Sequence, residues 1–489
     1  MGEKKMAQNV NAPVEQYHNA KQWEIALFSL NNSASNLYLF AFGFLTYYAT
    51  GVVGFATLTV ASLLGAARLF DGLIDPMIGV IMDHVDTKWG RFRPIMLISN
   101  IGLALSFALL FSTHLFDGGM KFVIYFIALI FHKIVYSFQQ TVTKAAQPVL
   151  TNNPKQRPLF SIYDTIFSSI GIFSLGQMLI ANWLAPRHGG EFNAAFFGEF
   201  ITGMVVLSFI LTVLAMIGIA RKDNKEYFGL GANSVETKSI KDYWSVVKGN
   251  RPLQVLALTS ALVKFLSTAI GDQVFLVLIF GIVLGNYGIS GTLGLIQIVP
   301  NLLLVAAFSI LASRTSLKNA YMASLTLLII SVSTMGLILY TSPDTTQIFA
   351  NGGLAMYAFS AGYIGFKIAA SYPTSIVLTM AADISDYETA RSGRFVSGLI
   401  GTVFSLTDSI STSLAPIMIG WLMIGIGFTD AYPGPDEPLS DGLFSAATTL
   451  LVILPVVISI IAMFLMTRYP LNRQKMEEIQ EKIAERKAA

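Results

Sequence analysis

The chain of 489 residues alternates along its whole length between long apolar stretches and short polar segments. Hydrophobic residues make up 54% of it, and Asp, Glu, Lys and Arg together only 12%, whereas a soluble domain carries about 25% charged residues. A soluble protein of this size would need far more charge to cover its surface. Because a membrane-spanning helix needs roughly 20 apolar residues, the pattern predicts an all-α polytopic membrane protein.

Hydropathy predicts twelve membrane spans, which would place both termini on one side of the membrane. Of the 32 Lys and Arg residues, 25 lie in segments that would then share the side of the termini, and only Lys121 and Arg187 lie in the opposite loops. Positive residues are retained in the cytoplasm, so we expect a cell-membrane protein with both termini cytoplasmic. The predicted spans are 26–50, 54–82, 94–114, 121–149, 159–184, 195–220, 252–284, 289–312, 320–341, 351–381, 396–427 and 442–468.

The longest polar connection divides the spans into two sets of six. We expect a cytoplasmic N-terminal segment (1–25), a six-helix bundle (26–220), a cytoplasmic central loop (221–251), a second six-helix bundle (252–468) and a cytoplasmic tail (469–489). Two six-helix bundles joined by a central loop are the architecture of major facilitator transporters.

The sequence lacks the residues that several classes of function require. The chain has no cysteine, and we find no nucleotide-binding or HExxH motif. A membrane enzyme should show a nucleophile with its base or a metal cluster, and a sensor should show a sizeable soluble domain; neither is visible. We therefore expect a non-enzyme without metal or cofactor, apart from a coupling ion.

Ionisable residues within spans are functional candidates, because each costs several kcal/mol in lipid. In the second span, Arg68, Asp71 and Asp75 share one helix face. Two carboxylates one turn apart must bind a cation, share a proton or pair with Arg68. The spacing therefore predicts a site for a coupling cation, with a purely structural salt-bridge network as the alternative.

The fourth span places Gln140 and Lys144 on one face, at a depth similar to that of Asp75. Lys144 either pairs with Asp71 or Asp75 or contacts a substrate, and pairing is the favoured interpretation. His132 and Lys133 are adjacent, so at most one of them faces a cavity.

The first span carries Asn31, Ser35 and Tyr38 on one face and Asn32 and Asn36 on the next. Such amides and hydroxyls can bind sugar hydroxyls, or they can form hydrogen bonds between helices.

The second half of the chain contributes Lys264, Asp272, Lys367 and Asp408. Lys264 and Asp272 lie too far apart along one helix for contact. We expect Lys367 to pair with Asp408 or Asp272, in a charge network that also includes Arg68. Asp408 lies in a hydroxyl-rich stretch that would suit a polar cavity wall.

Two motifs resemble one transporter family. The first runs Asp71-GLI-Asp75-Pro76-MI-Gly79-VIM-Asp83 and continues to WGRFRP at 89–94; the second is Asp383-IS-Asp386-Tyr387, followed by Ser392-Gly393-Arg394. Both resemble the signature of the glycoside–pentoside–hexuronide:cation symporters, to which the melibiose carrier belongs. The resemblance implies the major facilitator fold and sugar transport coupled to H⁺, Na⁺ or Li⁺.

The resemblance also implies site residues. Asp71 and Asp75, with Gln140 beside them, stand at the cation site. Ser35 and Gln140 are neutral where the melibiose carrier has acids; this favours H⁺, because Na⁺ requires several oxygen ligands. A cationic Lys144 would suit an acidic glycoside, although a salt bridge with Asp408 would explain it equally well. The substrate-binding candidates are Asn32, Ser35, Asn36, Lys144, Thr374, Asp408 and Ser409.

Charged residues at the inner ends of spans two and ten predict a gate, in which salt bridges between the halves would hold the outward-open state. The alternative is that positive loops are simply retained inside. The gate candidates are Asp83, Arg91, Arg93, Asp383, Asp386, Arg391 and Arg394.

These observations predict a secondary symporter that takes up a glycoside, pentoside or hexuronide by alternating access, with H⁺ as the favoured coupling ion. A Na⁺-coupled sugar symporter is the first alternative. A lysolipid carrier, whose group shares the WGRFRP-type motif, is the second, and the polar first span argues against it. We expect a monomer whose partners are the sugar and the lipid bilayer, with no nucleic acid.

Overall fold

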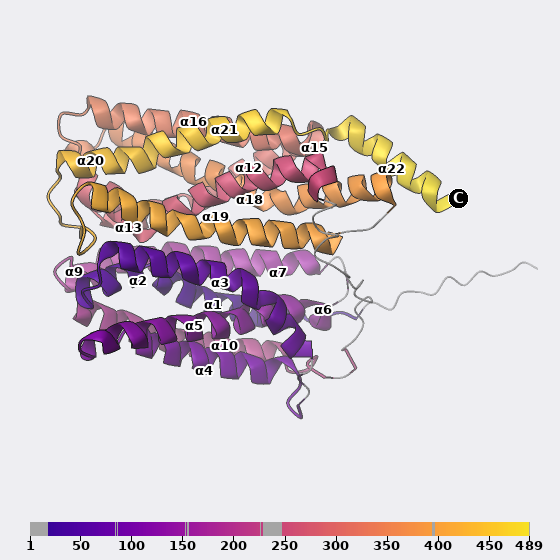
Figure 1. Ribbon diagram of the computed structural model, residues 1–489, viewed down its shortest axis with the longest axis horizontal. Helices are drawn as coiled ribbons and strands as arrows, with labels where there is room; N and C mark the ends of the chain where they lie inside the picture. Colours follow the sequence, from indigo (N-terminus) through magenta and orange to yellow (C-terminus); the bar gives the residue numbers. More distant parts are fainter. Residues whose placement is uncertain are drawn as a thin grey trace, which may run out of the picture.

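The computed structural model describes residues 18–83, 85, 87–151, 153, 156–224, 226–227, 247–393 and 397–488. Their regular elements are all helical, apart from one isolated bridge between Thr87 and Gly90. Most of the helices run along the longest axis of the molecule (Figure 1). Arg394 lies outside the described residues, as do the side chains of Asp75 and Asp83.

The first half of the chain forms one group of helices. Its elements are α1 (Gln22–Phe42), α2 (Leu45–Tyr47), η1 (Tyr48–Val52), α3 (Thr57–Asp83), α4 (Phe92–Leu110), η2 (Thr113–Leu115), α5 (Gly119–Ala145), α6 (Gln147–Leu150), α7 (Arg157–Asp164), η3 (Thr165–Ser174), α8 (Leu175–Leu179), η4 (Ile180–Leu184), α9 (Ala185–Arg187) and α10 (Ala194–Ile219).

The second half forms the other group. Its elements are α12 (Arg251–Ile270), α13 (Gln273–Leu276), η5 (Val277–Val283), α14 (Gly288–Ile296), α15 (Ile298–Arg314), α16 (Leu317–Thr341), α17 (Gln347–Ala350), α18 (Leu354–Ser392), α19 (Ser397–Gly425), α20 (Asp441–Thr448), η6 (Thr449–Ile453), α21 (Leu454–Thr467) and α22 (Arg473–Ala488).

Eight helical segments of the described chain are long and apolar enough to cross a membrane, or nine if the pair 273–283 and 288–296, bent by 113°, is one span. The predicted count of twelve is therefore not confirmed by length and composition. The helices α1, α3 and α18 are absent from the eight. Polar residues lower the mean hydropathy of α1 and α18, and several side chains of α3 lie outside the described residues.

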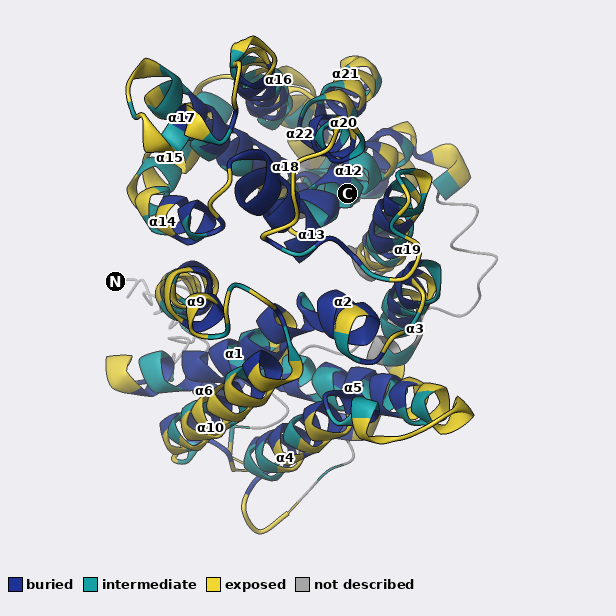
Figure 2. Cartoon of the chain, turned by 90° about the vertical axis from the view of Figure 1, so that its left-hand side faces the viewer, coloured by how far each residue is buried: buried dark blue, intermediate teal, exposed yellow. Residues whose placement is uncertain are grey.

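The two groups face each other across the middle of the molecule (Figure 2). Within the first group α1 packs along α10 and α4 along α5; within the second α16 packs along α18 and α12 along α19. The groups touch along two seams, α3 against α19 and α14 against α8 and η4. At the first seam, α3 and α19 approach each other closely. A Cβ atom on Gly65 would lie only 2.7 Å from the carbonyl oxygen of Ser413.

The two ends of the molecule differ in how the groups meet. We call the end that carries α9 and the 426–440 loop the α9 end, and the end from which α22 projects the α22 end (Figure 1). One hydrophobic cluster joins both groups and includes Tyr47, Phe192, Phe280 and Tyr432. Two further clusters each belong to one group, one around Leu253 and Ile479 and one around Ala20 and Ile219 at the α22 end.

Hydrogen bonds between the groups also gather at the α9 end. The Thr57 N–H donates to the Thr429 carbonyl at 2.9 Å. The Gln177 amide donates to the Tyr287 hydroxyl at 2.9 Å and to the Ser290 hydroxyl at 3.0 Å. Because the groups share a core and hydrogen bonds here, the described residues form a conformation closed at the α9 end.

Candidate functional site

An ion pair lies in the first group beside the α3–α19 seam. The Lys133 ammonium on α5 donates to Oδ2 of Asp71 on α3 at 2.7 Å, and it also lies 4.7 Å from the centre of the Phe42 ring. The Lys133 side chain is only 9% exposed and that of Asp71 31%. Pairing of Asp71 with Lys144 is thus wrong for this structure, in which Lys144 is exposed. The sequence contains a signal for the role of Lys133: it precedes Gln140 by seven residues, so the two side chains share one face of α5.

A second ion pair lies in the other group. The Lys264 ammonium on α12 is 3.0 Å from Oδ2 of Asp408 on α19, and both side chains are partly exposed. The expected pairing of Lys367 with Asp408 or Asp272 is wrong: the Lys367 ammonium instead donates to the Ile270 carbonyl at 3.5 Å. The reason is a helix break after Ile270, which leaves this carbonyl free and turns the Asp272 carboxylate toward the N–H of Val274 at 2.9 Å.

The two ion pairs flank a point where the groups touch. A Cβ atom on Gly72 would lie 2.7 Å from the Ser409 hydroxyl, so the two residues meet across the seam. Asp71 directly precedes Gly72, and Asp408 directly precedes Ser409. Arg68, one turn earlier on α3, interacts electrostatically with Asp71 and with Asp272 of the other group. A network of charges therefore spans the boundary between the groups.

The polar residues of α1 divide between two environments. The Asn32 amide donates to the Asp164 carboxylate, which also accepts from the Ser168 hydroxyl at 2.9 Å. Asn31 faces α5 instead, where its amide donates to the Thr143 hydroxyl at 2.8 Å. These contacts follow the two helix faces that the sequence distinguishes.

Ser35 is the site candidate whose placement disagrees with its predicted role. Its side chain is fully buried, and its hydroxyl donates to the Asn31 carbonyl at 3.1 Å. It therefore holds no group free for a substrate in this conformation, because it lies on the α1 face that packs inside the bundle. Asn36, on the other face, is half-buried.

The remaining candidates are at least partly accessible. The Gln140 amide donates to the Tyr136 hydroxyl at 3.2 Å, one turn earlier on α5. The Thr374 hydroxyl on α18 donates to the Ser371 carbonyl at 2.7 Å. Both side chains are half-buried, so each can exchange these local bonds for contacts with a ligand.

The gate residues interact within their own groups. Arg93 lies 3.4 Å from Asp223, and Arg391 lies 3.0 Å from Glu388. Asp386 accepts a hydrogen bond from the Gln480 amide of α22 at 2.7 Å. No ion pair joins the groups among the residues that the structure describes. The gate candidates Asp83 and Arg394 are not part of that comparison, because the Asp83 side chain and Arg394 lie outside the described residues.

Asp223 is a structural residue that the sequence did not reveal. Its buried carboxylate accepts hydrogen bonds from the backbone N–H groups of Arg91 at 2.8 Å and Arg93 at 2.9 Å, at the start of α4. Gly90 makes this approach possible, because its φ is +96° and a Cβ atom there would lie 2.3 Å from Asp223. The WGRFRP motif therefore wraps around a buried carboxylate.

Removal of this carboxylate should destabilise the chain. For Asp223→Ala we expect a loss of about 1–3 kcal/mol, because several buried donors lose their acceptor. A lower thermal unfolding midpoint would show it. The exposed Glu226, three residues further on, gives the matched control Glu226→Ala, which should leave the midpoint unchanged; equal midpoints for both variants would contradict the prediction.

The carboxyl group of Asp383 should make the free energy of unfolding depend on pH. It lies on α18 beyond the predicted span, and burial, followed by the charge of Asp386, raises its pKa to about 6 from the ordinary 3.8. The folded chain thus binds more protons between these two values than the unfolded chain, so stability falls as pH rises through this window. Asp383→Asn should remove the penalty and raise the unfolding midpoint at about pH 7.5, with little change at about pH 4. A lower midpoint than wild type at neutral pH would contradict this.

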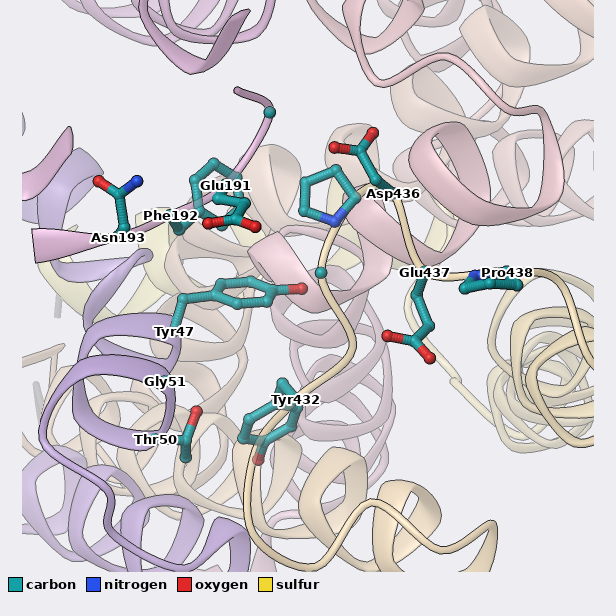
Figure 3. Close-up of a pocket in the computed structure, with 13 residues that line it drawn as sticks. Tyr47, Thr50, Gly51, Glu191, Phe192, Asn193, Tyr432, Asp436, Glu437 and Pro438 are labelled. Carbon is teal, nitrogen blue, oxygen red and sulfur yellow. The ribbon is translucent and has the colours of Figure 1, made fainter. Parts of the chain in front are cut away.

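A cavity of about 370 Å³ lies at the α9 end between the two groups. Its walls combine rings of Tyr47, Phe192 and Tyr432 with carboxylates of Glu191 and Glu437 (Figure 3). The three rings are buried, whereas the carboxylates are exposed at the rim. The cavity therefore has an aromatic interior and an acidic, hydrated opening.

Residues 30–473 match a family described as MFS/sugar transport protein. The chain belongs to this family. Membership makes it a multi-span membrane transporter rather than an enzyme, with the major facilitator fold. The resemblance to glycoside:cation symporters that the two motifs indicated is confirmed by the relatives.

Several curated relatives of this family member are named as glycoside or sugar carriers, at low sequence identity. A putative glycoside/cation symporter of Escherichia coli (strain K12) is 22% identical, with 91% of each chain covered. The isoprimeverose transporter of Lactiplantibacillus pentosus is 22% identical over 82% of this chain and 80% of its own. A glucuronide carrier protein homolog of Escherichia coli (strain K12) is 21% identical over 94% and 95%.

Solved structures share the fold. A proton dependent oligopeptide transporter superposes with a TM-score of 0.59 and 13% identity, covering 94% of this chain and 99% of its own. The nucleoside transporter NupG superposes with a TM-score of 0.57 and 13% identity, covering 91% and 99%. At such low sequence identities, these structures show only that the fold is shared.

Proposed function

We propose that this family member is a secondary symporter that takes up a glycoside, pentoside or hexuronide together with a cation. The observation that carries the proposal is the position of the two ion pairs, Asp71–Lys133 and Lys264–Asp408, on either side of the α3–α19 seam. A charge change at one pair can alter how the groups fit at the seam, which is the requirement for coupling an ion to alternating access.

The coupling ion we favour is the proton. The Lys133 ammonium, 2.7 Å from Asp71, already stands where a monovalent metal cation would bind the carboxylate. Sodium would have to displace this internal cation, whereas a proton on Asp71 cancels the charge that holds Lys133. The neutral Gln140 supports the same choice, and Na⁺ coupling remains the alternative.

The substrate we favour is a sugar bound between the groups. Asn36, Lys144, Thr374 and Asp408 offer partly exposed amide, ammonium, hydroxyl and carboxylate groups. These are the groups that bind sugar hydroxyls, and the names of the three relatives described above support this substrate class. An acidic sugar would place its carboxylate near Lys144 or Lys264.

The orientation follows from the distribution of basic residues, which puts the α22 end and both termini in the cytoplasm. The closed α9 end would then face outward, as we expect for a conformation that releases substrate inside. Opening of the α9 end would require the shared core and the Gln177–Tyr287 hydrogen bond to separate.

The test is transport by the purified protein in proteoliposomes against a panel of neutral glycosides, pentosides, hexuronides and a lysolipid. An inward pH gradient and an inward Na⁺ gradient are imposed separately. We expect a pH gradient alone to drive accumulation of at least one sugar. Stimulation by Na⁺ alone would refute proton coupling, and uptake of the lysolipid without any sugar would refute the substrate class.

A further inference from the structure

A cavity of about 440 Å³ lies at the α22 end of the first group, where the loop before α4 meets the last turns of α10. The two helices pack side by side on the part of the first group that faces away from the second (Figure 2). One wall consists of Lys88, Trp89 and Arg93, and the other of apolar residues of α10, among them Val213 and Ile217. The Trp89 side chain is 62% exposed and that of Ile217 51%, so both walls are open to a ligand.

The polar wall is held in place by hydrogen bonds within the protein. The Thr87 hydroxyl donates to the Gly90 carbonyl at 2.6 Å and accepts from the Trp89 N–H at 3.1 Å. The Arg93 side chain is fixed through its Nε, which donates to the buried Asp223 carboxylate at 3.4 Å. This contact uses one of the three guanidinium nitrogens, and the side chain is 27% exposed. Arg93 is therefore oriented and can still bind an anion.

The charge of the cavity is positive. Lys88 is exposed and shares the cavity with Arg93. Among the described residues that line it, none is acidic. The Asp223 side chain is 0% exposed, and its oxygens already accept backbone N–H groups of the loop. An arginine and a lysine that converge in this way are the groups that bind a phosphate.

Beyond the cavity, α10 offers an apolar path along the membrane-facing surface. Val206, Ile210, Val213 and Ile217 recur every three or four residues, so they share one helix face, and each side chain is at least 37% exposed. At a rise of 1.5 Å per residue this face is about 16 Å long, which matches the depth of roughly 15 Å that one leaflet contributes to the hydrocarbon core. A soluble anion would leave this face unused, whereas a lipid has an acyl chain to cover it.

We propose that this cavity binds the headgroup phosphate of an anionic phospholipid such as phosphatidylglycerol, from the leaflet at the α22 end. The phosphate would bind Lys88 and Arg93, the Trp89 indole would lie at the level of the headgroups, and one acyl chain would follow the exposed face of α10. Every membrane-facing helix touches lipid, but here a preformed basic cavity and an acyl-chain path adjoin. The site does not depend on which solute or coupling ion the protein transports.

Tryptophan fluorescence tests this site. The chain has five tryptophans; one variant keeps only Trp89 and a matched control keeps only Trp183, with Phe at the other positions. Trp183 is also exposed and lies 4.6 Å from the guanidinium carbon of Arg187, but it lies at the α9 end, where Glu199 pairs with that arginine. In bilayers of phosphatidylcholine mixed with phosphatidylglycerol, bromine on the acyl chains of one lipid or the other quenches nearby tryptophan. The quenching gives the relative binding constant of the two lipids at each tryptophan.

At Trp89 we expect phosphatidylglycerol to bind about tenfold more tightly than phosphatidylcholine, because two basic residues contact its headgroup. At Trp183 the two lipids should bind about equally. Lys88→Gln and Arg93→Gln should each lower the preference at Trp89 about threefold, and the exposed Lys88 can be replaced without a threat to folding. Molar NaCl should weaken the preference at the unaltered site, since salt screens an exposed charge pair.

Three results would overturn the proposal. They are equal binding of the two lipids at Trp89, the same preference at Trp183, and a preference that survives in Lys88→Gln/Arg93→Gln. Addition of millimolar inorganic phosphate should leave the preference unchanged. Loss of the preference on that addition would assign the cavity to a soluble anion and would also overturn the proposal.

Discussion

In proteoliposomes that contain Asp71→Asn, the sugar should equilibrate across the membrane but should no longer accumulate against its gradient. Asparagine keeps the shape of the side chain but can neither bind a proton nor pair with Lys133, which lies 2.7 Å away. The driving ion then loses the carboxylate that pairs with Lys133, and with it the charge change at the seam that shifts the conformational equilibrium. Uptake under an inward pH gradient, compared with exchange at zero gradient, measures the difference.

Two controls keep this result specific. Asp117→Asn removes an exposed acid from the loop before α5 and should leave accumulation intact. Asp71→Asn also leaves the Lys133 ammonium, 9% exposed, without its carboxylate, which should cost about 1–3 kcal/mol of stability. The double variant Asp71→Asn/Lys133→Gln should recover stability without recovering accumulation. Wild-type accumulation by Asp71→Asn would refute the coupling role.

Gly65→Ala should disrupt both stability and transport through the α3–α19 seam. The added Cβ atom would lie 2.7 Å from the Ser413 carbonyl oxygen and 2.8 Å from a side-chain carbon of Ile417. The backbone atom cannot rotate away, so the two helices must separate, at a cost of about 1–3 kcal/mol. The thermal unfolding midpoint should fall, and the initial rate of sugar uptake should fall with it.

Gly203→Ala is the matched control for this substitution. Gly203 lies within α10, and a Cβ atom there would meet nothing within 4 Å. Alanine favours a helix over glycine by roughly 0.5–1 kcal/mol, so this variant should be as stable as wild type or more so. If Gly65→Ala and Gly203→Ala have the same unfolding midpoint and the same initial rate of uptake, the close contact at Gly65 is not required for stability or transport.

The class of protein could be predicted from the sequence because insertion into a membrane depends on the hydropathy of each segment by itself. The candidate cation site could be found for a similar reason: the spacing of Arg68, Asp71 and Asp75 along one helix fixes their common face.

The partners of the charged residues could not be predicted. Helical periodicity states which residues share a face, but not how one helix is rotated against the next. Lys133 and Lys144 are both basic residues of α5, and only the packing of α5 against α3 brings Lys133 to Asp71. Lys367 likewise does not pair with Asp272 or Asp408, because helix α12 ends at Ile270. Hydropathy does not predict this helix end.

The sequence by itself determined that this chain is a helical membrane transporter with charges concentrated on a few spans, because hydropathy and helix spacing are local properties. Only the tertiary structure decided which charges pair, which end is closed and where the cavity at the α9 end lies. That cavity brings together 47–51, 190–193 and 432–438. Segments so distant in sequence meet only when the two groups of helices close on each other.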